Sequence, residues 1–348
     1  MKISIVIPYY NRRHLLFNCL KSLERQTYQK ENFEVVIIDD GSTEEIFEEI
    51  KKENFQINYQ YKYFARDENS CAATARNRGI ALSKGDYIAF IDCDVVCKPN
   101  YLTEIEAIIR ENNDEEAMFQ IGLRNYLLPD IFPDFMKENY GLKNGDYECD
   151  NRCRVFELYG YNLASICASW RLAYSCNLVV ERSHIEKIGL FDEQFSGWGL
   201  EDLEFTYRLY IHNIKPVFNP NIEVYHQHHA DNSDDSKDEE WRNNLKYFIQ
   251  KHGSMQVELQ KIFDFSGTCD DTWIQRFIMY EEVIRIIKEK QILKDKIYIP
   301  IENVEQLRAL TNKYQNKTLV CLCKKTNHKL IYIIQTKKEY ERTGLLII

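Results

Sequence analysis

The chain has 348 residues, of which 44% are hydrophobic and 28% charged, so it can bury a sizeable core and is not an intrinsically disordered protein. Its 13 Gly and 7 Pro exclude collagen-like and low-complexity architectures. The formal net charge of -9 argues against a protein that binds nucleic acid, because such proteins are normally basic. The charge is uneven, since residues 296–348 contain ten Lys or Arg and only four Asp or Glu, whereas the rest of the chain is acidic.

The first hundred residues alternate between strand and helix patterns. The predicted strands cover Ile3–Ile7, Phe33–Ile38, Asn58–Phe64 and Tyr87–Ile91. The first of them is a continuous apolar run, typical of a strand buried on both faces of a parallel sheet. The predicted helices between them cover Arg12–Gln26, Glu44–Glu53 and Ser70–Ser83. This order predicts an α/β fold with a mostly parallel sheet flanked by helices, in which ligands bind beyond the carboxyl ends of the strands.

The patterns of the later chain are less regular. Helices are predicted over Tyr101–Glu111, Arg182–Gly189, Leu200–His212, Trp241–His252 and Trp273–Lys290, and strands over Ala117–Gly122 and Val217–His226. The acidic residues 231–240 are predicted to form a solvated linker or loop. Residues 296–348 are predicted to be a small α/β appendage, with strands near Tyr298, at Thr318–Leu322 and at Leu330–Ile334 and a helix over 303–313.

The eleven cysteines do not indicate a disulfide framework, because their number is odd, the chain is long and no signal peptide is evident before the first strand. The pairs Cys149/Cys153 and Cys321/Cys323 lack the spacing of a zinc site. No stretch approaches the ~20 apolar residues needed to span a membrane. We therefore expect a cytoplasmic protein with mostly buried, reduced thiols.

Two acidic motifs follow predicted strands and should meet at one edge of the sheet. Asp39-Asp40-Gly41-Ser42 follows the second strand, and Asp92-Cys93-Asp94 follows the strand Tyr87–Ile91. Carboxylates one residue apart can project to the same side of an extended chain and suit a divalent cation that keeps water and phosphate ligands. The alternatives are a helix cap for the first motif and a turn with solvated acids for the second. Pro8-Tyr9-Tyr10-Asn11 ends the first strand at this edge, where a Tyr could stack on a planar base.

Two further motifs lie in the second half of the chain. Gly197-Trp198-Gly199-Leu200-Glu201-Asp202 places an aromatic ring on a turn and two carboxylates at the start of a helix, where one can act as a general base. The alternative is an ordinary helix N-terminus with a surface Trp. Tyr225-His226-Gln227-His228-His229 holds three imidazoles, from which we expect one metal ligand.

Together, these motifs resemble those of family 2 glycosyltransferases of the GT-A fold. The resemblance rests on 4–11, Ile38–Ser42, Ala75-Arg76-Asn77-x-Gly79 and Asp92-x-Asp94, in that order. The segments from Phe195 to Phe205 and at Tyr225-His226 are similar to a catalytic segment shared by galactosyltransferases, polypeptide N-acetylgalactosaminyltransferases and chondroitin-type polymerases. The resemblance covers about residues 1–230.

The resemblance implies a role for each matching residue. Donor binding would involve Pro8, Tyr10, Asp39, Asp40, Arg76, Asp92 and Cys93. Mn²⁺ or Mg²⁺ would be bound by Asp94, His226 and Asp92, and His228 is the second candidate for the imidazole ligand after His226. The acceptor would contact Trp198, Gly199 and Glu201, and Asp202 would be the general base.

The activity that these roles imply is transfer of a sugar from a UDP-sugar to a hydroxyl group, with inversion at the anomeric carbon. We expect a polysaccharide or lipid-linked oligosaccharide as acceptor, with a peptide or small molecule as alternatives. A nucleotidyltransferase is disfavoured because the first strand is not followed by a Gly-rich loop with a Lys. A catalytically decayed carbohydrate- or peptide-binding module is the remaining alternative.

We expect three parts in this chain. Residues 1–230 would be the catalytic domain, with a nucleotide-binding half (1–100) and an acceptor half (101–230). Residues 231–295 would be an acidic linker and helical segment, and 296–348 the basic appendage. This basic tail is hypothesised to contact an anionic acceptor, a partner or the inner membrane face, or to be only a soluble appendage.

Overall fold

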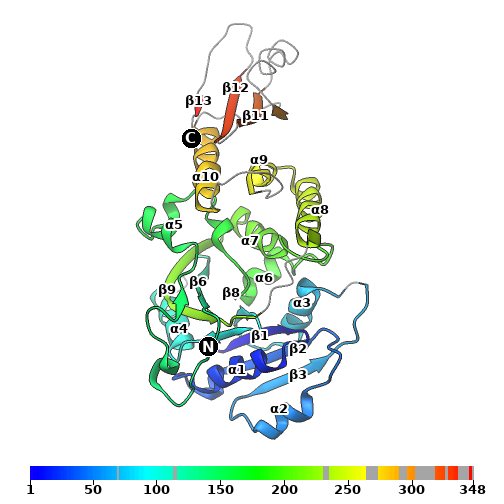
Figure 1. Cartoon of the computed structure of the whole chain (residues 1–348), viewed down its shortest axis with the longest axis vertical. Coiled ribbons are helices and arrows are strands. Elements are labelled where there is room, and N and C mark those ends of the chain that lie inside the picture. Colours follow the sequence, from blue (N-terminus) through cyan, green and yellow to red (C-terminus); the bar gives the residue numbers. More distant parts are fainter. Residues whose placement is uncertain are drawn as a thin grey trace. The chain divides into compact units, whose positions relative to one another are not determined.

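The computed structural model describes residues 1–68, 70–112, 116–229, 235–263, 273–289, 296–301, 318–325, 328–335 and 345–346 (Figure 1). The chain divides into two compact units, Met1–Gly253 and Ser254–Ile348. The first unit contains every motif singled out in the sequence, and it extends beyond residue 230.

The first unit is built from one sheet and the helices that flank it. Its strands are β1 (Ile3–Tyr9), β2 (Phe33–Asp39), β3 (Tyr59–Tyr63), β4 (Tyr87–Ile91), β5 (Val95–Cys97), β6 (Met118–Leu127), β7 (Tyr147–Glu148), β8 (Asn177–Glu181) and β9 (Lys215–His226). Its α-helices are α1 (Arg13–Glu24), α2 (Phe47–Glu53), α3 (Ala72–Leu82), α4 (Tyr101–Asn112), α5 (Cys153–Leu158), α6 (Arg182–Ile188), α7 (Glu201–Ile211) and α8 (Asp235–His252). Short 3₁₀ turns cover Lys30–Asn32, Glu138–Gly141, Leu163–Ser165 and Ser169–Leu172.

The sheet has the strand order β3-β2-β1-β4-β8-β6-β9-β5, and β7 pairs with β6. The strands from β3 to β4 are parallel, as the alternating pattern predicted. Beyond β4 the sheet is mixed, because β8 lies between β4 and β6 and is antiparallel to both. This insertion places residues just before β8 next to the carboxyl end of β4, where Asp92 and Asp94 follow.

Burial explains why the first strands are continuous apolar runs. In β2 every residue is buried, and in β1 all but Pro8 are. Helix α1 buries one apolar stripe that includes Leu16, Leu20 and Leu23, and α3 packs against β1 and β2. The carboxyl ends of β1, β2 and β4 are thereby fixed beside one another, as a parallel sheet requires.

The structure differs from the sequence predictions in several places. The predicted loop 231–240 is wrong in its second half, because α8 begins at Asp235; residues 230–234 lie outside the described part. The strands β5 and β8 had no separate prediction, because each is a short apolar run without a strong turn signal on both sides.

The second unit contains α9 (Met255–Glu258), a 3₁₀ turn (Leu259–Phe263) and α10 (Trp273–Glu289). It also contains a sheet of order β10-β11-β12-β13, with bounds Lys296–Ile301, Thr318–Lys325, His328–Gln335 and Leu345–Leu346. These bounds confirm the three predicted strands, whereas the predicted helix over 303–313 lies outside the described residues. Among the described residues, no helix combines the length and the apolar character required to cross a bilayer.

Candidate active site

The carboxyl ends of β1 and β2 carry residues predicted to bind the nucleoside. Tyr9 of β1 pairs with Asp39 of β2, and the backbone N–H of Asp40 donates to the carbonyl of Tyr9 at 2.9 Å. The buried Asp39 carboxylate accepts hydrogen bonds from the backbone N–H of Ser42 at 2.8 Å and from the Tyr61 hydroxyl. Asp39 therefore holds the turn that presents Asp40.

Asp40 lies between two guanidinium groups. Arg66 and Arg78 each approach its carboxylate at 3.4 Å. Burial raises the pKa of Asp40, and the two Arg charges act against that rise. Arg66 also lies over the Tyr10 ring, 4.2 Å from its centroid, and this ring is 41% exposed. Arg66 thus brings the predicted donor residues Tyr10 and Asp40 together, while Pro8 is half-buried near the end of β1.

Asp94 is the centre of a group of side chains that can hold a metal ion. Its Oδ2 lies 3.6 Å from Nε2 of His226 and 3.1 Å from Nε2 of His229, and all three residues offer ligand atoms within 4.8 Å of one another. Oδ1 of Asp94 is buried and has no hydrogen-bond partner among the described residues. Burial lowers the pKa of His226 and so favours the neutral ring that a metal ligand requires. One carboxylate and two imidazoles fit a first-row divalent ion.

The turn after β9 decides which histidine approaches Asp94. His228, predicted as the second candidate, is exposed and is not in the group, whereas His229 is. The strand ends at His226, and the backbone N–H of Gln227 then donates to the carbonyl of Asp94 at 2.8 Å. This contact ends the extended alternation that would have placed His226 and His228 on the same side.

Arg76 connects the loop after β4 to the start of α7. Its guanidinium is buried, with Nη2 3.2 Å from Oδ1 of Asp92 and Nη1 3.1 Å from Oε1 of Glu201. Burial raises the pKa of Asp92, Arg76 acts against this rise, and the neighbouring Asp94 adds to it. Asp92, predicted to bind the metal, pairs with Arg76 and is not in the group around Asp94. Arg76, predicted to face the nucleotide, therefore joins an acid of the loop after β4 to an acid at the start of α7.

Asp202 lies in the first turn of α7, next to Glu201. Its carboxylate accepts from the backbone N–H of Leu203 at 2.7 Å and of Ser175 at 3.4 Å. Burial and the negative charge of Glu201 raise the pKa of Asp202 to about 7, although Arg76 acts against them. A partly buried carboxyl group that titrates near neutral pH is suited to accept a proton from a hydroxyl group.

The Gly-Trp-Gly turn before α7 is held by α8. Gly197 and Gly199 have φ values of +68° and +92°, which favour glycine, and the Trp198 ring between them is 51% exposed. The Trp198 backbone N–H donates to the Glu240 carboxylate at 2.8 Å, and the Asn244 amide donates to the Gly199 carbonyl at 2.8 Å. The exposed ring thus sits on a braced turn close in sequence to Asp202.

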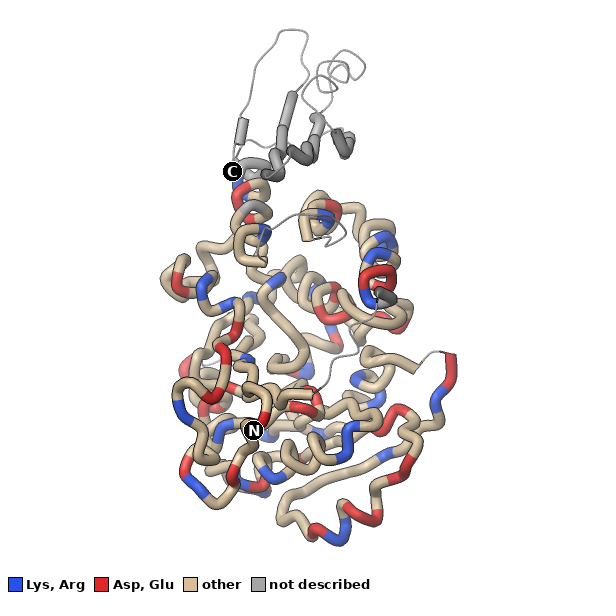
Figure 2. Tube along the Cα trace, viewed as in Figure 1, with Lys and Arg blue, Asp and Glu red and all other residues tan. Residues whose placement is uncertain are grey.

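Charged residues are distributed along the whole first unit. Figure 2 shows acidic and basic residues interspersed along the first unit, so the excess of acids is not confined to one stretch. Cys93 adds no charge between Asp92 and Asp94, because it is buried and burial raises the pKa of its thiol. The side chains of the basic tail lie outside the described residues.

Sequence reasoning did not single out several residues that complete the site. Most of them belong to no motif and are brought in by the fold, whereas Arg78 fills the variable position of the motif at 75–79: Arg12, Arg66, Arg78, Arg124, Ser175, Glu240 and Asn244. Only the presence of three nearby imidazoles in the sequence gave a signal for His229.

Two family models match this chain. The model described as glycosyl transferase family 2 matches residues 4–149, and the model described as the N-terminal domain of galactosyltransferase matches residues 164–230. The chain is 29% identical over 317 residues to a validoxylamine A glucosyltransferase of Streptomyces hygroscopicus subsp. jinggangensis, covering 87% of this chain and 72% of that protein. It is also 29% identical over 242 residues to a hyaluronan synthase of Pasteurella multocida, covering 65% of this chain and 24% of that protein.

Solved structures show the same fold. A crystal structure of S. aureus TarS 1-349 in complex with UDP-GlcNAc has a TM-score of 0.53 at 18% identity, covering 90% of this chain and 80% of that one. A structure of GalNAc-T7 with UDP, GalNAc and Mn²⁺ has a TM-score of 0.53 at 17% identity, covering 81% of this chain and 54% of that one. The fold and the family matches together define a glycosyltransferase of the GT-A fold, which confirms the predicted fold class and enzyme class. The match of residues 4–149 to the family 2 model confirms the predicted resemblance to family 2 glycosyltransferases.

Proposed function

We propose that this chain is a metal-dependent, inverting glycosyltransferase that moves a sugar from a UDP-sugar to a hydroxyl group of a glycan. The observation that carries the proposal is the ion-pair bridge from Asp92 through Arg76 to Glu201. This bridge fixes the carboxylate next to the base Asp202 relative to the loop that holds Asp94. The Asp202 carboxyl group, which would accept the proton, is therefore held at a fixed position relative to Asp94 and the other proposed metal ligands.

A UDP-sugar donor is supported by the donor side of the site. The half-exposed Tyr10 ring and the Asp40 carboxylate lie at the carboxyl edge, where ligands of parallel sheets bind. The Tyr10 ring can stack on a planar base and Asp40 can accept a hydrogen bond from it. The structures of TarS and GalNAc-T7 contain UDP-GlcNAc and UDP, respectively.

A divalent cation would be held by Asp94, His226 and His229. When bound, it would neutralise charge on the diphosphate and so make UDP a better leaving group. The unpartnered Oδ1 of Asp94 supports this, since a buried carboxylate oxygen normally has a partner. Mn²⁺ in the GalNAc-T7 structure also supports a cation of this kind.

Asp202 would remove the proton from the acceptor hydroxyl. The acceptor oxygen then forms a bond to the anomeric carbon while the bond to the diphosphate oxygen breaks and UDP takes that electron pair. Attack opposite the leaving group inverts the anomeric configuration, and no covalent nucleophile is required. The backbone N–H groups of Ser175 and Leu203 orient the carboxylate, and Glu201, which pairs with Arg76, would hold the acceptor hydroxyl.

The acceptor would bind against Trp198 and Gly199. An exposed aromatic ring on a braced turn can pack against the apolar face of a sugar ring. We favour a polysaccharide or a lipid-linked oligosaccharide, and the likeness to a hyaluronan synthase supports this class. A small molecule is the second candidate, favoured by the likeness to a validoxylamine A glucosyltransferase over 87% of this chain.

The proposal is tested by incubating the protein with UDP-sugars and an oligosaccharide panel. We expect UDP release that requires both an acceptor and Mn²⁺ or Mg²⁺, and a product of inverted anomeric configuration by NMR. Retention of configuration would contradict the single-base mechanism. Pyrophosphate release from a nucleoside triphosphate, without UDP release, would instead indicate a nucleotidyltransferase.

The basic tail 296–348 is proposed to contact an anionic acceptor or a membrane surface. Its charge supports this, with ten Lys or Arg against four Asp or Glu. Removal of the tail should reduce co-sedimentation with anionic vesicles or turnover of a charged acceptor. If neither changes, the tail is a soluble appendage.

A further inference from the structure

Arg124 is a cation of β6 that forms no ion pair with a carboxylate in the described part of the chain. Its Nη1 donates to Sγ of Cys176 at 3.4 Å and its Nη2 to the Tyr126 hydroxyl, which are both uncharged groups. Its Nε is buried without a hydrogen-bond partner among the described residues. The buried Arg152, by contrast, pairs with Asp150. Arg124 is half-buried, and a guanidinium in such a position without an ion-paired acid is suited to bind an anionic ligand.

The pairing of β6 with β9 is irregular just before Arg124. The register shifts between Ile121 and Leu123, and the extra residues lie on β9. A Cβ on Gly122 would lie 2.0 Å from the Ile222 carbonyl oxygen, so only glycine fits this close approach. The close packing at Gly122 therefore fixes the backbone of β6 immediately before Arg124.

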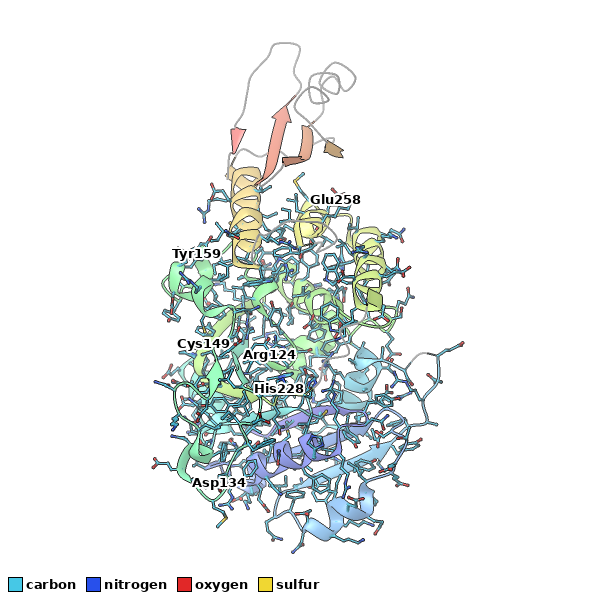
Figure 3. The ribbon with its side chains drawn as sticks, viewed as in Figure 1. Arg124, Asp134, Cys149, Tyr159, His228 and Glu258 are labelled. Atoms are coloured by element: carbon cyan, nitrogen blue, oxygen red, sulfur yellow. The ribbon has the colours of Figure 1, made fainter. Side chains whose placement is uncertain are left out.

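Arg124 lies between the two chemical ends of the site. Toward the metal ligands, it contacts Tyr126, whose ring centroid is 5.4 Å from that of His226. Toward the base, it contacts Cys176, which follows Ser175, the residue whose backbone N–H donates to Asp202. Figure 3 labels Arg124 among the side chains of the first unit, and this residue is half-buried.

We propose that Arg124 binds the β-phosphate of the donor and holds the UDP leaving group. This inference rests on the proposed function and deepens it by assigning a donor-binding residue. The leaving diphosphate must lie between the cation and the sugar, and the sugar must lie between the diphosphate and the base. A guanidinium located between the metal ligands and the base would therefore lie near the bond between the anomeric carbon and the diphosphate oxygen. Its planar set of N–H donors matches the geometry of phosphate oxygens.

The charge of Arg124 also suits the leaving group. As UDP departs, the negative charge that develops on its β-phosphate would be met by this guanidinium.

The test compares the binding of UDP and UMP, which differ only in the β-phosphate, by isothermal titration calorimetry with Mn²⁺ present. Arg124→Gln should weaken UDP binding by about 10-fold or more and leave UMP binding unchanged. Arg124→Lys, which keeps the charge but not the fork of donors, should recover part of the loss. Arg154→Gln, which removes an exposed guanidinium on α5, is the matched control and should change neither affinity.

The UDP and UMP titrations have three informative outcomes. A loss for UDP alone supports the inference, because a merely structural defect would weaken UMP as well. Unchanged UDP affinity in Arg124→Gln, or equal losses for UDP and UMP, would overturn it. If the wild-type protein binds neither nucleotide, the proposed function itself fails, so the two failures are distinguishable.

Discussion

Replacing Asp202 by Asn should lower the rate of sugar transfer without lowering the stability of the folded protein. The change keeps the shape of the side chain but removes the proton acceptor, so sugar transfer should fall by roughly 10²–10⁴-fold, the range for a lost general base. Folding should not suffer. Burial and Glu201 disfavour the ionised carboxylate of Asp202, whose pKa is raised to about 7, so the neutral amide removes an unfavourable charge above neutral pH.

The size of the stability gain follows from proton linkage. The pKa of Asp202 is raised from 3.8 to about 7, so the folded protein retains a proton that the unfolded chain has already lost between these pH values. Stability of the wild type therefore falls as pH rises through this window, with a ceiling of roughly 4 kcal/mol at about 1.4 kcal/mol per pKa unit. Asp202 is only partly buried, so solvent screening reduces the expected gain for Asp202→Asn to about 1–2 kcal/mol.

Urea unfolding at pH 4.5 and pH 8 measures this difference. Asp202→Asn should be more stable than wild type at pH 8 and nearly equal to it at pH 4.5. Glu186→Gln on α6, an exposed acid, is the control and should show no such dependence on pH. A variant that is less stable at pH 8, or one that keeps full transfer activity, would refute the assignment of Asp202.

Three further predictions concern the other parts of the site. His229→Ala should weaken Mn²⁺ binding by about 10-fold or more in calorimetry, whereas His228→Ala should leave it unchanged because that ring is exposed; equal losses would contradict the ligand assignment. Glu201→Gln removes the charge that raises the pKa of Asp202, so the acid limb of kcat/KM should move to lower pH; a limb that stays in place or moves upward would speak against this coupling. Asn244→Ala releases the carbonyl of Gly199, so KM for the acceptor should rise several-fold while KM for the donor is unchanged, and a purely donor-side effect would be inconsistent with a braced acceptor turn.

The parallel half of the fold was predictable because its signals are local. Strands β1, β2 and β4 are mainly apolar runs, β3 alternates Tyr with polar residues, and each intervening helix has its own pattern, so only right-handed crossovers were needed to order them. The second half was not predictable in the same way. The position of β8 between β4 and β6 depends on long-range pairing, including the buried Asn177 amide, which donates to the carbonyls of Leu123 and Ile222 at 2.9 Å.

The residues of the candidate site also divide into those with a local sequence signal and those that depend on long-range contacts. Asp40, Asp94 and Asp202 could be singled out because they follow a strand or open a helix within a motif. His229 was ranked behind His228 because the sequence does not show that β9 ends at His226, after which Gln227 bonds to the backbone of Asp94. Glu240 stands in a segment whose charge resembles a solvated loop, so its contact with Trp198 could be recognised only in the folded chain.

The central claim is that this site transfers a sugar from a UDP-sugar with the help of a divalent cation. It is tested most directly by measuring UDP release from a panel of UDP-sugars, with an oligosaccharide acceptor and with Mn²⁺ present or removed by EDTA. We predict acceptor-dependent release from at least one donor that disappears with EDTA and returns when Mn²⁺ is added back. Release that is indifferent to EDTA, or no release from any donor, would contradict the claim.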